Sequence, residues 1–274
     1  MTNDKTDFFE SQYGNYYDLP IWRQRNAGRV VDLFYDARLK LNQSYRGLLH
    51  SIDQAPVRDV LLVGVEVPAR AQDLQAVFSE LKRTRHRITA INAPLLEGKG
   101  KFQNINACLQ DLNINDYDWL LVIDDDITVP HRFLDKFIYL AEKTALKLCQ
   151  PAHLFHSYQY YAITQRVWNS LPRTTHYVEC GSVTAFHRDL YPFVLPFADL
   201  RWAWGNDVVW AERARNNDLR IGIIDGTPIE HLRPVAVSYS SKLARLEGDR
   251  YLDVSGVTRS RSDILKTVDV ISKL

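Results

Sequence analysis

The chain alternates between short apolar runs and longer amphipathic segments, a pattern typical of an α/β protein. Apolar runs of strand length are predicted to form buried strands at residues 59–67, 87–91 and 119–123. Helical spacing of apolar residues predicts helices over residues 71–83 and 103–112. Strand, helix and strand in succession predict a parallel sheet with right-handed crossovers.

The same pattern continues through the second half of the chain. A helix is predicted to begin near Pro130, and another, over residues 208–217, has Asn206 as its expected N-cap. Asp225-Gly226 is expected to turn the chain after a strand. The strands expected in this half are residues 146–150, 179–186 and 219–224. The predicted fold class is therefore α/β, with a mainly parallel central sheet flanked by helices.

The first 57 residues have a different character, because aromatic residues interleave there with arginines. Apolar spacing predicts one or two amphipathic helices over residues 21–49. We interpret the segment as a helical extension whose apolar residues pack on the main domain; the alternative is a surface for a partner or an acceptor. The apolar residues of these helices are Val30, Leu33, Phe34, Leu39 and Leu41. The aromatic residues of the segment are Phe8, Phe9, Tyr13, Tyr16, Tyr17, Trp22, Phe34, Tyr35 and Tyr45.

The chain is predicted to divide into three parts. Residues 1–57 form the N-terminal extension, residues 58–240 form the main domain, and residues 241–274 form a C-terminal tail or helix that packs on it. The connection into the main domain is expected near Ala55-Pro56.

Composition narrows the functions open to the chain. Of its 274 residues, 46% are hydrophobic and 24% are charged, which is typical of a globular protein. A formal net charge of +1 argues against a nucleic-acid partner. Cys108, Cys149 and Cys180 have neither disulfide nor zinc spacing, which favours a reducing compartment. No apolar run approaches the roughly 20 residues of a spanning helix. We therefore expect no signal peptide or membrane anchor, and a cytoplasmic protein for which peripheral contact with the inner face of a membrane stays open.

Three consecutive carboxylates follow the apolar run at residues 119–123. Alternation along a strand points Asp124 and Asp126 the same way, so the two could share a hard cation such as Mg2+ or Mn2+. The alternative is that the aspartates cap a turn or the helix near Pro130. Because ligands bind outside the carboxyl ends of strands in open α/β sheets, the metal interpretation is favoured.

Other polar residues are expected at the same rim. Arg70 follows the first strand, and Gly98-Lys-Gly-Lys101 precedes a helix, although this short loop lacks the spacing of a phosphate-binding P-loop and is equally typical of a solvated turn. Gly181 and Ser182 would let a ligand approach the backbone, unless they form an ordinary tight turn.

An aromatic segment and a histidine supply further candidates. Trp202 and Trp204 precede Asp207, and two tryptophans beside a carboxylate are suited to holding a sugar ring, whereas core packing is the simpler explanation. His231 follows a predicted strand, and a lone histidine is more often structural than a metal ligand. Arg233, Lys242 and Arg245 are expected either to contact a diphosphate or to form a solvated face.

Six short motifs in this order resemble those of GT-A glycosyltransferases, most of all family 2. The resemblance spans roughly residues 59–235. Its motifs are Val67-Pro-Ala-Arg70, Gly98-Lys-Gly-Lys-Phe-Gln-Asn104, Asp124-Asp-Asp126, Cys180-Gly-Ser-Val-Thr-Ala-Phe186, Gly205-Asn-Asp207 and His231. It implies the GT-A fold and a metal-dependent glycosyltransferase of hexosyltransferase type, with a role in polysaccharide biosynthesis.

The resemblance also implies a role for each matching residue. Asp124, Asp126 and His231 would bind Mn2+ or Mg2+ on the diphosphate of a nucleotide sugar, and Asp207 would be the base of an inverting reaction. The implied donor contacts are Pro68, Arg70, Asn92, Lys99, Lys101, Asp124 and Asp125. The implied contacts to the acceptor or the transferred sugar are Gly181, Ser182, Trp202, Trp204 and Asn206. The implied partners are a nucleotide-sugar donor and a glycan or glycolipid acceptor.

Two departures from the family pattern affect these expectations. Asn206 stands where the family has an acidic residue, which leaves Asp207 as the only candidate base in that motif. Asn92 stands where the family often has an aspartate against uracil, so a UDP-sugar remains the favoured donor with less support. The alternatives are a metal-dependent phosphohydrolase or nucleotidyltransferase, and a sugar-binding member of the fold that has lost catalysis.

Overall fold

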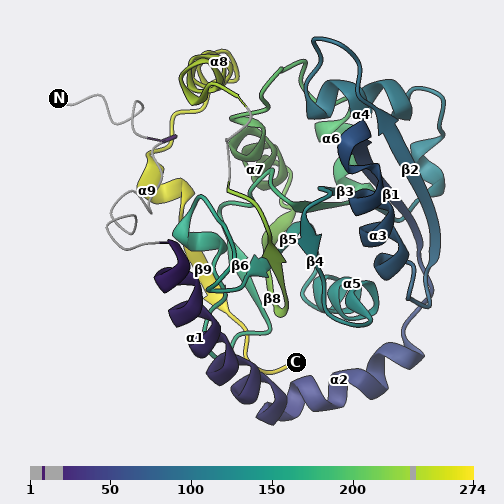
Figure 1. Ribbon diagram of the computed structural model, residues 1–274, viewed down its shortest axis with the longest axis vertical. Coiled ribbons are helices and arrows are strands. Elements are labelled where there is room, and N and C mark those ends of the chain that lie inside the picture. Colours follow the sequence, from purple (N-terminus) through teal and green to yellow (C-terminus); the bar gives the residue numbers. More distant parts are fainter. Residues whose placement is uncertain (1–7, 10–20, 235–238) are drawn as a thin grey trace.

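The computed structural model describes residues 8–9, 21–234 and 239–274, and its centre is a mixed sheet (Figure 1). The strand order is β2-β1-β3-β7-β5-β8-β6-β9, and the short strand β4 pairs with β8 away from this path. The strands are β1 (Asp59–Glu66), β2 (Arg87–Pro94), β3 (Trp119–Ile123), β4 (Ile127–Thr128), β5 (Leu146–His153), β6 (Pro172–Thr175), β7 (Val183–His187), β8 (Arg220–His231) and β9 (Thr267–Val270).

Helices lie on both sides of this sheet and around its edge (Figure 1). The α-helices of the described residues are α1 (Ile21–Leu41), α2 (Gln43–Gln54), α3 (Ala71–Leu81), α4 (Lys101–Leu109), α5 (Phe133–Lys143), α6 (Tyr191–Val194), α7 (Asn206–Asn216), α8 (Ser241–Val254) and α9 (Arg261–Ile264). Among the helices that the structure describes, none is long and apolar enough to cross a membrane.

Strand direction changes along the sheet. β1 pairs in parallel with both β2 and β3, and β5 pairs in parallel with β8. β7 runs antiparallel between β3 and β5, and β6 pairs antiparallel with both β8 and β9. The predicted α/β class with a helix-flanked central sheet is confirmed. The division at residues 57 and 240 stays a prediction, and β9 from the C-terminal segment extends the central sheet.

β3 is buried on both faces, as its continuous apolar sequence predicts. Trp119, Leu121 and Ile123 pack into the core that α2, α3 and α5 cover, while Leu120 and Val122 pack into the core under α4, α6 and α7. A third cluster joins Phe8 and Phe9 to α7 and α9. Because β3 is enclosed by two cores, its carboxyl end is held firmly in place.

The N-terminal extension packs on the main domain through residues such as Leu48 and Ile52, but the inward packing predicted for its five named helix residues is wrong for four of them. α1 and α2 follow the outside of the sheet (Figure 1), but Val30, Leu33, Phe34 and Leu41 are 55%, 69%, 65% and 68% exposed. Leu39 alone of the five predicted apolar residues packs against the core. The aromatic residues Tyr13, Tyr16 and Tyr17 lie outside the described residues.

The inward face of α1 carries small and polar residues instead. A Cβ on Gly28 would lie 2.7 Å from the backbone of Phe155, so only glycine allows this approach. The buried carboxylate of Asp32 accepts the backbone N–H groups of Phe155 and His156 at 3.1 and 3.2 Å and pairs with Arg166. Hydrogen bonds and ion pairs, rather than an apolar seam, therefore hold the helix.

Two local predictions are also wrong. The N-cap of α7 is Gly205, at φ +94°, and Asn206 is the first residue of the helix. Asp225-Gly226 lies within β8, because the buried Asp225 carboxylate accepts Ser170 Oγ at 2.7 Å and Arg173 Nε at 3.1 Å. A bulge against β5, not a turn, accommodates the glycine.

Candidate active site

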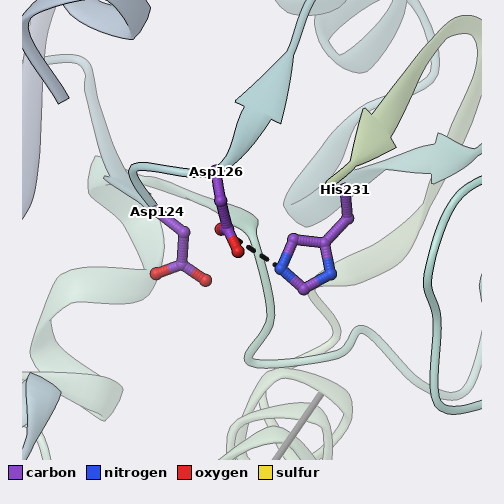
Figure 2. Close-up of side chains that lie close together, drawn as sticks. All are labelled: Asp124, Asp126 and His231. Atoms are coloured by element: carbon purple, nitrogen blue, oxygen red, sulfur yellow. Dashed lines mark ion pairs between the residues drawn. The ribbon is translucent and has the colours of Figure 1, made fainter. Parts of the chain in front are cut away.

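The predicted carboxylates and histidine meet at the carboxyl end of β3 (Figure 2). Asp124, Asp126 and His231 each offer one ligand atom within 4.8 Å of the others. His231 Nε2 lies 3.2 Å from Asp126 Oδ1, and Asp124 stands beside this pair. The alternative of a helix cap is wrong, because the N-cap of α5 is Arg132. The predicted convergence of Asp124, Asp126 and His231 is confirmed.

Backbone pairing explains how residues far apart in sequence meet here. β4 follows Asp126 directly and pairs antiparallel with the end of β8, which places Ile127 opposite His231. The N–H of Leu232 donates to Asp126 O at 2.8 Å, and Ser157 Oγ accepts the N–H of His231 at 2.7 Å. These hydrogen bonds of the main chain hold the rim in place. The side chains of Asp126 and His231 therefore meet there without having to attract one another.

The histidine and the carboxylate stabilise each other's charged forms. Burial opposes charge on His231, but the hydrogen bond to Asp126 and the neighbouring Asp124 outweigh it, so its pKa is raised. Burial likewise opposes charge on Asp126, yet its bond to His231 gives a net lowered pKa. A divalent cation bound to Asp126 could therefore replace the positive charge that His231 now supplies to it.

Cationic side chains surround the carboxylates. Lys101, at the start of α4, contacts Asp124 Oδ1 at 2.7 Å and donates to Gly181 O at 3.0 Å. Arg70 and Arg233 both bind Asp125 Oδ1, at 3.1 and 3.2 Å. Burial raises the pKa of Asp125, and Arg70 opposes that rise. Asp125 thus holds two arginines at the rim, where a phosphate would meet them.

The donor set suits a divalent cation. Two carboxylates and an imidazole, each with one ligand atom within 4.8 Å of the others, match the mixed oxygen and nitrogen ligands that Mn2+ accepts, and the carboxylates alone suit Mg2+. Asp124 and Asp126 come from one loop, while His231 comes from β8, where its backbone N–H donates to Ser157 Oγ. The residues present therefore fit the metal that the sequence predicted.

Asp207 has very different surroundings. It is 5% exposed at the start of α7, where Tyr177 Oη donates to its Oδ2 at 2.6 Å and the N–H of Val208 to its Oδ1 at 2.9 Å. Cys180 Sγ lies 3.7 Å from the same Oδ2. Burial raises the pKa of Asp207, and the bond from Tyr177 opposes that rise.

Glu179 is a site residue that the sequence analysis did not single out. Burial raises its pKa to about 8, and the charge of Asp207 adds to that rise. Its side chain lies against Gly181, where a Cβ would meet Glu179 Cγ at 3.4 Å. The signal in the sequence was its place two residues before Gly181, but a single glutamate before a turn carries no specific meaning.

A second pair of polar residues lies at the ends of β1 and β2. Asn92 Nδ2 donates to Glu66 Oε2, and the two residues lie near the carboxyl ends of neighbouring parallel strands. Glu66 was not predicted as a site residue, because a carboxylate near the end of a strand is common. Its pairing with Asn92 places a carboxylate next to the position that the sequence analysis associated with the nucleobase.

The two predicted tryptophans contact other side chains of the protein. Trp204 packs among Phe9, Tyr160 and Tyr239, and its Nε1 donates to Tyr239 Oη at 3.0 Å, so its ring contributes to the core. Trp202 is partly exposed, with Arg201 over its ring at 5.5 Å.

The remaining predicted contacts differ in their exposure. Asn206 is fully buried. Ser182 is 3% exposed and accepts the N–H of Asp124 at 2.9 Å through its carbonyl oxygen. Pro68 and Lys99 are exposed, and no contact in the described part of the chain joins Lys99 to the carboxylates. The ligand roles of these residues stay predictions.

Comparison with known proteins relates this architecture to glycosyltransferases. No protein-family model and no curated protein sequence matches the chain. The mannosyltransferase PcManGT of Pyrobaculum calidifontis, solved with GDP-Man and Mn2+, is similar in structure, with a TM-score of 0.50 and 12% identity over 88% of this chain and 79% of that one.

Two further structures are similar at comparable distance. S. aureus TarS, solved with UDP-GlcNAc, has a TM-score of 0.52 and 9% identity over 73% of this chain and 66% of that one. A Drosophila β-1,4-galactosyltransferase 7 variant, solved with manganese, UDP-Gal and xylobiose, has a TM-score of 0.45 and 14% identity over 69% and 79%. With the Asp triplet directly after β3 and His231 brought by β8 to the same rim, the chain has the GT-A fold of PcManGT and TarS.

Proposed function

We propose that the protein is a metal-dependent glycosyltransferase that moves a sugar from a nucleoside-diphosphate sugar to a hydroxyl group. The observation that carries the proposal is the cluster of Asp124, Asp126 and His231 at the ligand-binding rim of a GT-A fold. Two cationic side chains, Lys101 and Arg233, lie beside this cluster. A carboxylate–imidazole cluster beside cations suits a metal-bound diphosphate and is unsuited to a neutral ligand.

We call Asp124, Asp126 and His231, with the cations around them, the donor half of the site. This half binds and neutralises the diphosphate. Asp124, Asp126 and His231 would hold Mn2+ or Mg2+, which when bound supplies positive charge against the leaving diphosphate. Lys101 contacts Asp124 and would turn to a phosphate oxygen once a cation takes that carboxylate. Arg70 and Arg233, both held by Asp125, present N–H groups to the same charge.

We call Asp207 and the residues around it the acceptor half of the site. This half supplies the general base. In the proposed inverting reaction Asp207 takes the proton of the acceptor hydroxyl while its oxygen bonds to the anomeric carbon and the bond to the diphosphate oxygen breaks. The Tyr177 hydroxyl, 2.6 Å from Asp207 Oδ2, keeps that carboxylate in position, while Oδ1 accepts the N–H of Val208. Gly181, Ser182 and Trp202 are the proposed contacts to the acceptor or sugar, with weaker support for the packed Trp204 and Asn206.

The nucleobase is proposed to lie against the ends of β1 and β2. Pro68 begins the short turn after β1, and the Glu66–Asn92 pair offers a carboxylate and an amide beside it. A carboxylate accepts the imide N–H of uracil or the amino and imide N–H groups of guanine. We retain a UDP-sugar as the first donor to test, with GDP-sugars next.

The acceptor is proposed to be a glycan or a glycolipid, as in the synthesis of a polysaccharide. We keep family 2 as the proposed group within the fold, and residues 58–240 as the catalytic domain. The unpaired cysteines support a reducing compartment, for which we propose the cytoplasm.

Product analysis tests the proposal. Purified protein with Mn2+ and a panel of UDP-, GDP- and TDP-sugars is expected to release nucleoside diphosphate, and to do so faster when an acceptor is added. Release of inorganic phosphate or pyrophosphate would instead show a phosphohydrolase or nucleotidyltransferase. Binding of a nucleotide sugar without turnover on any acceptor would favour a sugar-binding protein.

A further inference from the structure

The helix α1 presents an apolar stripe to the outside of the molecule. Val30, Leu33, Phe34 and Leu41 are each more than half exposed. Their spacings of three, four, seven and eleven residues place them on one face of the helix. Exposed apolar side chains that share a helix face, rather than lying scattered, mark an interaction surface.

The opposite face of the helix is fully engaged by the protein. Arg25 binds Glu230 at 2.6 Å, and Asp32 binds both His156 and Arg166. Asp36 also binds Arg166, at 2.7 Å. These bonds fix the rotation of α1, so the stripe cannot turn inward without breaking several ion pairs. The exposed stripe is therefore a stable feature of the fold.

Basic residues border the stripe on both flanks. Arg29 and Lys40 are eleven residues apart and follow one side, while Arg38 follows the other. Both acidic residues of the helix, Asp32 and Asp36, are paired with Arg166. Trp168 packs edge-on against Tyr35 at 4.9 Å and is 49% exposed, which adds an amphipathic ring beside the helix.

We propose that this face of α1, the residues Val30, Leu33, Phe34 and Leu41 with the flanking Arg29, Arg38 and Lys40, binds a membrane surface containing anionic lipids. An apolar stripe between rows of cations is the arrangement by which interfacial helices insert apolar side chains among acyl chains and meet lipid phosphates. A second copy of the chain is disfavoured, because pairing two such stripes would bring like charges together.

The surface does not depend on the proposed function, but its position is relevant to it. α1 binds Glu230, and Glu230 precedes His231 in β8. His156 lies between the Asp32 and Glu230 carboxylates, at 2.7 and 3.3 Å. A membrane held by α1 would thus be linked rigidly to the strand that carries the proposed metal ligand, which suits a lipid-linked acceptor if the protein is a glycosyltransferase.

Co-sedimentation of the full chain with vesicles tests the inference. The protein is expected to bind vesicles of phosphatidylcholine and phosphatidylglycerol in equal parts, and to be released by high salt, while binding phosphatidylcholine vesicles weakly. The double variant Leu33→Ser/Phe34→Ser is expected to lower the partition coefficient by about tenfold or more. Arg29→Gln/Lys40→Gln is expected to lower it by roughly tenfold on the anionic vesicles alone.

Matched variants control for general effects of charge and surface polarity. Val254→Ser removes an apolar side chain that is 83% exposed on α8, and Lys82→Gln/Arg83→Gln removes two exposed cations after α3. Both are expected to leave binding unchanged, and all these variants should retain the wild-type melting temperature and the response to Mn2+ and nucleotide. The melting temperature reports on folding, and the response to Mn2+ and nucleotide reports on the proposed function. Vesicle binding can therefore fail or succeed independently of the proposed function.

Three results would overturn the inference. The first is a wild-type protein that does not bind the anionic vesicles. The second is Leu33→Ser/Phe34→Ser protein that binds them as well as wild type. The third is a concentration-dependent dimer, seen by sedimentation velocity, that the same double variant converts to monomer, since this would assign the stripe to contacts between copies.

Discussion

The two halves of the candidate site hold carboxylates in opposite ways. Asp124 and Asp126 lie beside Lys101 and His231, whose charges can be exchanged for a cation and a diphosphate. Asp207 is buried and is held by a tyrosine hydroxyl and a backbone N–H. Under the proposed function, the first pair would exchange its partners when metal and donor bind, whereas Asp207 would stay in one orientation for a single proton transfer.

Removing the Asp126 carboxylate should have the largest effect. Asp126→Asn is expected to abolish the response to Mn2+ and lower kcat/KM by about 1000-fold, because a ligand that is also paired to His231 is lost. Steady-state nucleoside-diphosphate release checks this result. Asp189→Asn, which removes a carboxylate paired with Lys147 far from the rim, is the matched control and should keep near-normal activity.

Asp207→Asn should act on turnover and spare donor binding. We expect kcat to fall at least about 100-fold with an unchanged Kd for the donor, since the variant removes the base alone. Tyr177→Phe, which removes the bond to Oδ2, should lower kcat by roughly tenfold. Tyr191→Phe is the control, because its hydroxyl bonds the main chain of Tyr117 instead. A weaker donor Kd with normal kcat would reverse the roles given to the two halves.

Arg233 should contribute to donor binding. Arg233→Met is expected to raise the KM for the donor by about tenfold with little change in kcat, as expected for a charge-assisted bond to phosphate. Arg188→Met, which breaks a comparable pair with Asp118 away from the rim, should leave KM unchanged. Equal KM values for both variants and the wild type would show that the arginine serves Asp73 and Asp125 only.

Glu179 should give a smaller, pH-dependent effect on stability. The folded chain holds the Glu179 proton up to a pKa of about 8, whereas the unfolded chain releases it near 4.5. The folded state therefore binds more protons in this window, and the free energy of unfolding contributed by Glu179 falls as the pH rises through it. Glu179→Gln should flatten that decline, measured as melting temperature against pH in EDTA, while the control Glu80→Gln, at a partly exposed glutamate paired with Arg83, should not.

The donor half was largely predictable from the sequence. Three aspartates after an apolar strand form a strong local pattern, and a strand after which His231 follows can return to the same rim. What the sequence could not supply was the pairing of β4 with β8, which fixes the main chain of Asp126 beside the end of β8. The ion pair between Arg233 and Asp125 could not be predicted either, because it depends on the positions of side chains from two separate segments.

The remaining misses have a common physical cause. The orientation of α1 was predicted wrongly, because apolar spacing shows which residues share a helix face but not whether that face is turned toward the core. The buried Asp32 decides this through ion pairs with residues that are distant in the sequence. Glu179 gains its significance from burial beside Asp207, which no single stretch of sequence shows. Asp225-Gly226 looked like a turn until Arg173 and Ser170 provided partners within β8.

The most direct test of the donor site is a thermal-shift measurement with UDP and GDP, each with and without Mn2+. Wild-type protein is expected to melt at a higher temperature with one of these nucleotides only when Mn2+ is present, because the complex forms with the native state alone. The Asp124→Ala/Asp126→Ala protein should show no such rise. An equal rise without metal, or in the double variant, would contradict the assignment of Asp124, Asp126 and His231 as the metal-binding half of a glycosyltransferase site.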